Sequence, residues 1–316
     1  MKKVLVTGAA GSVGLSLIKY LLSEGKYEIT ALDLKTKNVY KRLHRYRHRI
    51  NIIYGDVLDR NLLEPLIKEA NIVIHLATCL PPLAEYKKAL VNLIDYSSTE
   101  NIVRAINYYN PKCLLIYASS TSVYSKDITD IHEKLRIGDN RYFDNAKIAS
   151  EKIISKKVKN YIIIRVPLVL GDLRKDPFIY NIKGNEQIEV ITKEDAGYAF
   201  CACIDKFNKL NNKIINIGGG ETCRCSYNEL RANILKYHGL SWKYVLTLVF
   251  GEKNYTIPIL KDSDDSNKLL SYRNDSLQSY YMRQKRRSKN RKLSIILAKP
   301  FIYFINKKIK RETKYE

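Results

Sequence analysis

Three glycines near the start of the chain have the spacing of a phosphate-binding turn. They are Gly8, Gly11 and Gly14, and they follow the short apolar run 4–6. In such a turn the first glycine permits the tight bend, the second lets a pyrophosphate approach the backbone, and the third lets a helix pack closely on the strand. The N–H groups that open the helix then face the phosphates. We therefore expect a dinucleotide site, which also includes the turn residues Ala10, Ser12 and Val13.

A carboxylate completes this pattern about twenty residues further on. Residues 28–33 are predicted to form the second strand, and this strand ends on Asp33. A carboxylate at this place accepts hydrogen bonds from the adenosine ribose and repels a 2′-phosphate. The sequence therefore favours NAD over NADP as the cofactor, although Lys35 and Lys37 weaken that preference.

The elements that must position these residues alternate along the chain. Strand-like apolar runs and helical patterns follow one another, which predicts a doubly wound parallel α/β sheet, a Rossmann-like fold, with a small C-terminal substrate lobe. We expect strands at 50–57, 72–77, 113–117 and 161–166, a strand and turn at 213–220, and helices at 61–69, 86–109 and 143–158. Ligands of such sheets bind beyond the carboxyl ends of the strands. The residues that should converge there are Gly11, Asp33, Asp56, Ala77 and Ser120.

We expect three parts in the chain. Residues 1–165 form the NAD(P)-binding domain, with later strand elements up to about 220, and residues 166–280 form the substrate lobe interleaved with them. Residues 281–316 form a tail in which basic clusters flank the apolar run 293–305. This run is too short to span a membrane, but the basic and apolar segment 283–311 suits an element lying on an anionic membrane surface. The alternatives are a helix packed on the lobe and, without a recognisable motif, a nucleic-acid contact.

Several motifs occur together in an order that is typical of one superfamily. They are TGAAGSVG, Gly55-Asp56-Val57, His75-Leu76-Ala77, Asn92 with Asn101, the run 119–124, Lys147 with Glu151, Asp195, and Asn216 with the glycines 218–220. Over residues 2–240 the chain resembles the extended short-chain dehydrogenase/reductase superfamily, in its NAD-dependent epimerase/dehydratase branch. The resemblance implies that Asp56, with Val57 beside it, contacts the adenine. It also implies that Leu76 and Ala77 line the cofactor, and that Asn92 and Lys147 contact it.

The same resemblance implies a catalytic Ser, Tyr and Lys, the last two in the arrangement Tyr-x-x-x-Lys. The Tyr exchanges the hydroxyl proton, the Lys lowers the Tyr pKa and holds the nicotinamide ribose, and the Ser orients the substrate oxygen. Ser120 and Lys147 fit this pattern, but Phe143 stands in the tyrosine position and has no proton to exchange. Tyr142 lies about 100° away around a helix. It would serve as the catalytic residue only if the helix begins late or bulges there; otherwise it is an ordinary helix-start residue.

Two further departures concern the substrate. Leu168 occupies the position at which the family usually places an Asn that contacts a sugar nucleotide. The interval 171–195 is also shorter than the substrate loop that the resemblance implies. Both departures weaken the expectation of a nucleotide-sugar substrate and leave the expectation for the fold unchanged.

The net charge and the cysteine spacing limit the kinds of binding partner and metal that we expect. Lys and Arg outnumber Asp and Glu by 55 to 32, a net charge of +23, which implies attraction to a nucleic acid, an anionic membrane or a phosphorylated substrate. The pairs Cys201/Cys203 and Cys223/Cys225 are spaced more closely than usual zinc ligands, so we expect buried thiols and no metal. Such cysteine usage suits a reducing cytoplasm.

Two hypotheses for the function remain open. The first is an NAD-dependent epimerase, dehydratase or reductase-like enzyme that acts by hydride transfer on a phosphorylated or nucleotide-linked sugar, in cell-surface polysaccharide synthesis. The second is a catalytically degenerate NAD(P)-binding protein that is regulatory, membrane-associated or RNA-binding. A homodimer and peripheral attachment to the inner face of the membrane are also left open.

Overall fold

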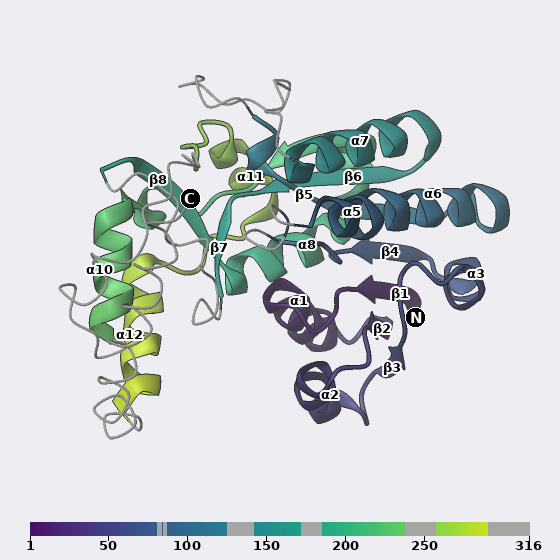
Figure 1. Cartoon of the computed structure of the whole chain (residues 1–316), viewed down its shortest axis with the longest axis horizontal. Helices are drawn as coiled ribbons and strands as arrows, with labels where there is room; N and C mark the ends of the chain where they lie inside the picture. Colours follow the sequence, from purple (N-terminus) through teal and green to yellow (C-terminus); the bar gives the residue numbers. More distant parts are fainter. Residues whose placement is uncertain (81–83, 85–86, 125–141, 172–184, 238–256, 290–316) are drawn as a thin grey trace, which may run out of the picture.

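A parallel sheet forms the centre of the molecule (Figure 1). The computed structural model describes residues 1–80, 84, 87–124, 142–171, 185–237 and 257–289. Within them seven strands are ordered β3-β2-β1-β4-β5-β6-β9, and all neighbours are parallel. Their bounds are β1 Lys2–Thr7, β2 Tyr27–Asp33, β3 Asn51–Tyr54, β4 Ile72–His75, β5 Leu114–Ser120, β6 Tyr161–Val166 and β9 Lys213–Asn216. The predicted doubly wound α/β fold is confirmed.

Helices cover both faces of this sheet. Helices α1 and α8 share one buried apolar cluster with Val4 and Val6 of β1, whereas α3, α6 and α7 share another with Leu5. Strand β1 is therefore buried on both faces, which explains its continuous apolar run. The bounds of the helices on this sheet are α1 Ser12–Glu24, α2 Lys37–Leu43, α3 Arg60–Glu69, α6 Ser98–Tyr109, α7 Tyr142–Lys157, α8 Lys193–Asp205 and α9 Phe207–Leu210.

The segment expected as one helix over 86–109 differs from that expectation. Helix α5, Lys88–Val91, continues into a π-helical segment, Asn92–Ser97, before α6 begins. A π turn contains an extra residue and therefore changes which side chains face the core. In this segment Asp95 is completely buried, whereas Asn92 is exposed.

A smaller lobe contains the strands β7 Leu168–Leu170, β8 Gln187–Thr192 and β10 Arg224–Ser226. Its helices are α10 Tyr227–Tyr237 and α12 Leu277–Lys289, whereas α11 Ser263–Leu270 lies against β9 and α8 of the main sheet. Helices α10 and α12 lie side by side at the left of Figure 1. The expected boundary at 280/281 lies inside α12, and both Tyr280 and Tyr281 are buried in the core of this lobe. The basic tail is therefore continuous with the lobe at least as far as Lys289.

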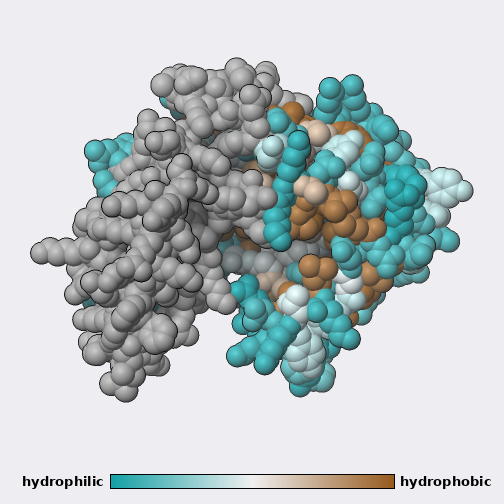
Figure 2. Space-filling model, viewed as in Figure 1, coloured by the Kyte–Doolittle hydropathy of each residue, from teal (hydrophilic) through white to brown (hydrophobic). Residues whose placement is uncertain are grey.

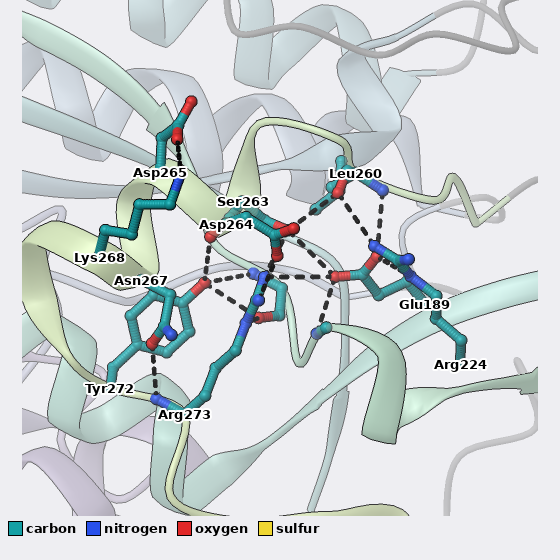
Figure 3. A network of polar contacts seen from close by, with 12 residues as sticks. Glu189, Arg224, Leu260, Ser263, Asp264, Asp265, Asn267, Lys268, Tyr272 and Arg273 are labelled. Carbon is teal, nitrogen blue, oxygen red and sulfur yellow. Dashed lines mark hydrogen bonds and ion pairs between the residues drawn. The ribbon is translucent and has the colours of Figure 1, made fainter.

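A buried carboxylate connects the lobe to the end of the main sheet (Figure 3). Glu189 of β8 is fully buried and forms an ion pair with Arg224 of β10, with a distance of 2.9 Å between Nε and Oε2. Its other oxygen accepts hydrogen bonds from the Gly220 N–H and the Ser263 hydroxyl, at 3.0 and 3.2 Å. The turn after β9 and the start of α11 are thereby fixed to the same side chain.

None of the helices within the described ranges has the length and apolar character required to cross a membrane.

Candidate functional site

The glycine turn between β1 and α1 has the geometry that its sequence predicts. Gly8 has φ +66°, and a Cβ there would lie 2.7 Å from the Ala77 nitrogen, so only glycine fits this close approach to the end of β4. A Cβ on Gly14 would lie 2.6 Å from the Ala9 carbonyl oxygen, because α1 packs tightly on the turn. A Cβ on Gly11 would meet only the Gly8 carbonyl oxygen within 4 Å. The space in front of Gly11 is therefore open to a ligand.

The start of α1 fits an anionic group at this place. Gly11 is the N-cap and provides no side-chain cap, and the first turn of the helix contains no acidic residue. Because the first N–H groups of a helix lack intrahelical partners, they form an anion site together with the positive end of the helix dipole. The turn residues Ala10, Ser12 and Val13 surround this helix start. The residues present therefore fit the diphosphate of a dinucleotide.

Asp33 lies at the carboxyl end of β2 and contacts the same turn. Its Oδ2 accepts a hydrogen bond from the Ala10 N–H at 2.8 Å, and its Oδ1 accepts one from the Leu34 N–H at 2.8 Å. Burial raises the pKa of Asp33, while the hydrogen bond from Ala10 and the charge of Arg42 act in the opposite direction. The Arg42 guanidinium also donates to the Ala10 carbonyl at 3.1 Å. A carboxylate held in this way can accept hydrogen bonds from ribose hydroxyls.

The remaining residues expected at the cofactor follow β3 and β4. Asp56 is exposed, and its Oδ1 accepts a hydrogen bond from the Leu58 N–H at 3.0 Å, while Val57 is buried behind it. Leu76 donates its N–H to the Thr7 carbonyl at 3.2 Å, and Ala77 packs against Gly8. The strand register places these positions beside the glycine turn and Asp33, at the carboxyl-terminal end of the strands. Their convergence was predicted correctly, whereas their contacts with a cofactor stay predictions.

Lys147 lies on α7 at the same carboxyl-terminal end of the strands, and it is 2% exposed. Its Nζ donates to the Ala118 carbonyl at 3.0 Å and lies 3.0 Å from Oδ1 of Asp95. Burial alone would lower the pKa of Lys147, but Tyr117 and Asp95 outweigh that effect, and the pKa is raised. Lys147 is therefore a buried, charged ammonium.

The two aromatic residues that start α7 point to different places. The Phe143 ring is buried, with its centroid 5.6 Å from Nζ of Lys147. Tyr142 is 43% exposed, and its ring lies against Lys88, 4.6 Å from Nζ of that residue. The described helix begins at Tyr142 and continues as a regular α-helix. In this structure it is therefore Phe143 that contacts Lys147, and the catalytic role predicted for Tyr142 stays a prediction.

Ser120 ends β5 and is half-buried. Its Oγ accepts hydrogen bonds from the Ser122 N–H at 3.1 Å and from the Ser122 hydroxyl at 2.8 Å. The Ser122 N–H holds Oγ of Ser120 as an acceptor, which fixes the position of this hydroxyl at the end of β5. That geometry suits a hydroxyl that donates to a substrate oxygen.

Asp95 is the site residue that sequence reasoning missed. It is 0% exposed, and besides Lys147 it accepts hydrogen bonds from the Thr78 hydroxyl at 2.5 Å and the Cys79 N–H at 2.9 Å. Asn92, which was expected at the cofactor, is exposed three residues earlier. A signal was present, because Asp95 lies four residues after Val91 and seven before Ile102, both buried. A carboxylate on the apolar stripe of a helix requires a cation as its partner.

A second buried ion pair supports the site from behind. Arg165 of β6 pairs with Glu151 of α7, with its Nη2 2.7 Å from Oε2. Ser119 of β5 donates its hydroxyl to Oε1 of Glu151 at 2.5 Å, and Arg165 also donates to the hydroxyl of Tyr124 at 2.9 Å. Asn216 of β9 donates to the same hydroxyl at 2.8 Å. This network fixes α7 against the ends of β5, β6 and β9.

Asp195 and the paired cysteines, which the sequence also singled out, make contacts within the folded chain. Asp195 opens α8, and its carboxylate accepts hydrogen bonds from the backbone N–H groups of Asn274 and Asp275; burial raises its pKa to about 6. The paired cysteines at 201/203 and 223/225 are all buried free thiols. In the part of the chain that the structure describes, no group of three or more His, Cys, Asp or Glu could hold a metal ion.

Comparison with known proteins agrees with this architecture. The model of the NAD dependent epimerase/dehydratase family matches residues 4–192. A UDP-N-acetyl-alpha-D-glucosaminuronate decarboxylase of Bacillus cytotoxicus is 28% identical over 169 residues, which are 52% of this chain and 49% of that protein. The chain spans about half the length of the curated relatives it matches.

Solved structures share the fold over nearly the whole chain. The UDP-glucuronic acid 4-epimerase of Bacillus cereus, solved with UDP-glucuronic acid and NAD, superposes with a TM-score of 0.73 at 21% identity, and the match covers 90% of this chain and 99% of that one. A tyrosine-to-phenylalanine variant of that epimerase, solved with NAD and a fluorinated analogue of UDP-glucuronic acid, superposes with the same TM-score at 21% identity, over 91% and 99% of the two chains.

Proposed function

Because the chain belongs to the NAD dependent epimerase/dehydratase family, we propose that it binds NAD at the carboxyl ends of β1, β2 and β4 and acts on a nucleotide-linked sugar by hydride transfer. The glycine turn carries this proposal, since the open space at Gly11 and the uncapped start of α1 form a diphosphate cradle next to Asp33. The relatives whose names include a UDP-sugar support the class of substrate.

The proposed mechanism assigns a role to each group at the nicotinamide end of the site. NAD, when bound, supplies the hydride acceptor and donor. The Lys147 ammonium would hold the ribose hydroxyls, and the Ser120 hydroxyl, positioned by the Ser122 N–H, would orient the substrate oxygen. Tyr142 would exchange the substrate proton, which requires its ring to leave Lys88 and the start of α7 to unwind or bulge there, because α7 is regular from Tyr142 onward. A Tyr142→Phe variant that keeps full turnover would exclude this role.

A second candidate function follows from Phe143. Since its ring covers Lys147 where an acid/base tyrosine is expected, the chain would bind NAD without oxidoreductase turnover and serve as a regulatory or assembly protein. The tyrosine-to-phenylalanine variant of the Bacillus cereus epimerase was solved with NAD and a substrate analogue. That protein therefore binds NAD with one of its tyrosines replaced by phenylalanine.

One experiment separates the two candidates. The purified chain is incubated with NAD and each of a panel of UDP-, dTDP- and CDP-linked sugars, and products are followed by nuclear magnetic resonance and by the absorbance of reduced cofactor. The enzyme predicts a changed sugar in at least one reaction, with Ser120→Ala lowering the rate. Saturable NAD binding with every sugar unchanged supports the second candidate, and absence of NAD binding contradicts both.

We also propose that the chain is cytoplasmic and contacts an anionic membrane surface. The expected contact segment 283–311 lies mostly outside the described residues, but α12 already presents Lys285 and Arg286 to solvent. A second basic surface supports the proposal: between Asp33 and Asp56 there is no acidic residue, and the cations are Lys35, Lys37, Lys41, Arg42, Arg45, Arg47 and Arg49. Each basic residue near an anionic bilayer contributes about 1 kcal/mol.

Vesicle co-sedimentation tests this contact. The chain should bind vesicles with a third of phosphatidylglycerol and not pure phosphatidylcholine, and truncation after residue 289 should weaken the binding. Binding that is equal for both lipids, or a higher affinity for RNA in the same buffer, would contradict the proposal.

A homodimer is supported by exposed apolar side chains on neighbouring elements. Leu93 of the π-helical segment is 45% exposed and Tyr142 of α7 is 43% exposed. Figure 2 shows apolar residues gathered over the region where Figure 1 places α5 and its neighbours. Mass photometry of the wild type and of Leu93→Glu tests this, since the substitution should convert dimer to monomer.

A further inference from the structure

The ammonium of Lys147 has a carboxylate partner from a different element. Asp95, in the π-helical segment, lies 3.0 Å from Nζ of Lys147, and their side chains are 0% and 3% exposed. Taking a charge out of water is costly unless it is paired and hydrogen-bonded. Asp95 satisfies both conditions, because Thr78 and Cys79 donate to its two oxygens. The ion pair is therefore electrically neutral and hydrogen-bonded, and it lies at the carboxyl-terminal end of the strands.

The other groups that face Lys147 carry no compensating charge. The Tyr117 ring lies 5.0 Å from Nζ, and burial raises the pKa of its hydroxyl, which therefore stays neutral. His75 lies on β4 beneath the pair and shares hydrogen bonds with Thr7 and Ser98; burial, together with Lys147, lowers its pKa to about 3. Cys79 is a neutral thiol, because burial and Asp95 raise its pKa. The Phe143 ring, with its centroid 5.6 Å from Nζ, cannot ionise.

We propose that Asp95 is the positioning residue that replaces, as the anionic partner of Lys147, the ionisable tyrosine missing at position 143. The residue choices at 95 and 143 are then coupled: with Asp95 present, the Lys147 charge is already neutralised, and a phenol at 143 would gain little from it. This coupling between positions 95 and 143 deepens the proposed function. It rests on that function only for the statement that Lys147 faces the cofactor.

The coupling has a measurable electrostatic consequence. An opposite charge within about 4–6 Å lowers the pKa of an acid by roughly 1–3 units. In Phe143→Tyr alone, the positive field of Lys147 is cancelled by Asp95 and position 143 is buried, so the introduced phenol should titrate at or above the ordinary tyrosine pKa of about 10. In Phe143→Tyr/Asp95→Asn the ammonium is uncompensated, so the phenol pKa should fall by ~1–3 units. In Phe143→Tyr/Lys147→Gln only Asp95 remains charged, so the phenol pKa should rise.

The experiment is a near-ultraviolet difference titration of the full chain without cofactor. Each variant with Phe143→Tyr is measured against its own parent with Phe143, so that the other tyrosines cancel, and circular dichroism checks the fold at each pH. The expected order of the phenol pKa is Asp95→Asn lowest, Asp95 with Lys147 intermediate, and Lys147→Gln highest. Equal phenol pKa values in the three backgrounds, or a low value in Phe143→Tyr alone, would overturn the proposal.

Turnover provides a second readout. If the proposed enzyme function holds, Phe143→Tyr/Asp95→Asn should raise kcat on the responsive sugar more than the product of the two single effects. The titration needs neither NAD nor substrate. A negative titration result would therefore contradict only the coupling between positions 95 and 143. A failure to bind NAD would contradict the proposed function without affecting the titration result.

Discussion

Oδ2 of Asp33 accepts a hydrogen bond from the backbone N–H of Ala10 over 2.8 Å, which joins the end of β2 to the glycine turn. The carboxylate is therefore held in place before any ligand arrives. Preorganisation of this kind reduces the ordering cost of binding. It also places a negative charge where the 2′-position of an adenosine ribose would lie.

Loss of that charge should weaken the binding of NAD and relax the discrimination against NADP. In Asp33→Asn the Ala10 hydrogen bond can persist, but the charged acceptor for the ribose is lost. Since a hydrogen bond to a charged group contributes ~1.5–3 kcal/mol, the NAD affinity should fall about 10- to 100-fold. Isothermal titration calorimetry with both cofactors measures this. Asp265→Asn, which removes an exposed carboxylate paired with Lys268, is the control. An unchanged ratio of the NADP and NAD affinities would contradict the role of Asp33.

Two glycines of the same turn should respond in opposite ways to alanine. Gly8→Ala places a methyl 2.7 Å from the Ala77 nitrogen at φ +66°, so it should cost roughly 1–3 kcal/mol of unfolding free energy. Gly11→Ala has an ordinary φ of −63° and meets only the Gly8 carbonyl, at 3.1 Å. It should change stability by less than about 1 kcal/mol and lower NAD affinity at least tenfold. Urea unfolding and calorimetry on the same preparations measure both quantities. Normal NAD binding by Gly11→Ala would place the diphosphate elsewhere.

Breaking the buried pair behind the site should destabilise the whole domain. Glu151→Gln leaves the fully buried Arg165 without its anion, which typically costs ~3–5 kcal/mol. The control is Glu69→Gln, which breaks the exposed pair with Lys3 and should cost less than about 1 kcal/mol. Denaturant unfolding with a shared m-value gives the comparison. Similar costs for the two variants would mean that the buried network does not hold α7.

His75 should make stability depend on pH. Its pKa is about 3 in the folded chain, because burial lowers it from the ordinary 6.5. Between these values the unfolded chain binds more protons, so the unfolding free energy should fall as pH is lowered from 6.5 toward 3, by about 1.4 kcal/mol per pH unit. Asp195, whose pKa is raised from the ordinary 3.8 to about 6, acts with the opposite sign between these two pH values.

The comparison with His75→Gln isolates this contribution, because both proteins retain Asp195. The stability difference between the wild type and His75→Gln should shrink as the pH falls below 6.5. Parallel pH profiles of the two proteins would show that folding does not lower the pKa of His75.

The fold and the residues expected at the cofactor, the glycine turn and Asp33, were predictable because the sequence patterns that encode them are local. A continuous apolar run such as 4–6 indicates a strand buried on both faces, and a glycine turn after it fixes the start of a helix. Gly8, Gly14 and Asp33 lie where these patterns require. The sequence predicted a doubly wound parallel sheet, and the structure adds the order of its strands.

The arrangement around Lys147 was not predictable in the same way. The choice between Tyr142 and Phe143 depends on where α7 begins, and the burial of Asp95 in place of Asn92 depends on a π-helical segment. A π segment changes the facing side chains by an extra residue per turn, and the spacing of Asp95 from Val91 and Ile102 indicates its burial without identifying its partner. The pairing of Asp95 with Lys147 joins residues far apart in the sequence, so it becomes visible only when the two helices are packed.

The binding of NAD to the full chain tests the central claim most directly. Isothermal titration calorimetry of the wild type, after any retained cofactor has been removed and identified by native mass spectrometry, should show one saturable site per chain. Gly11→Ala should abolish or strongly weaken that heat while the protein remains folded. A folded wild-type chain that gives no heat with NAD or NADP would contradict the account.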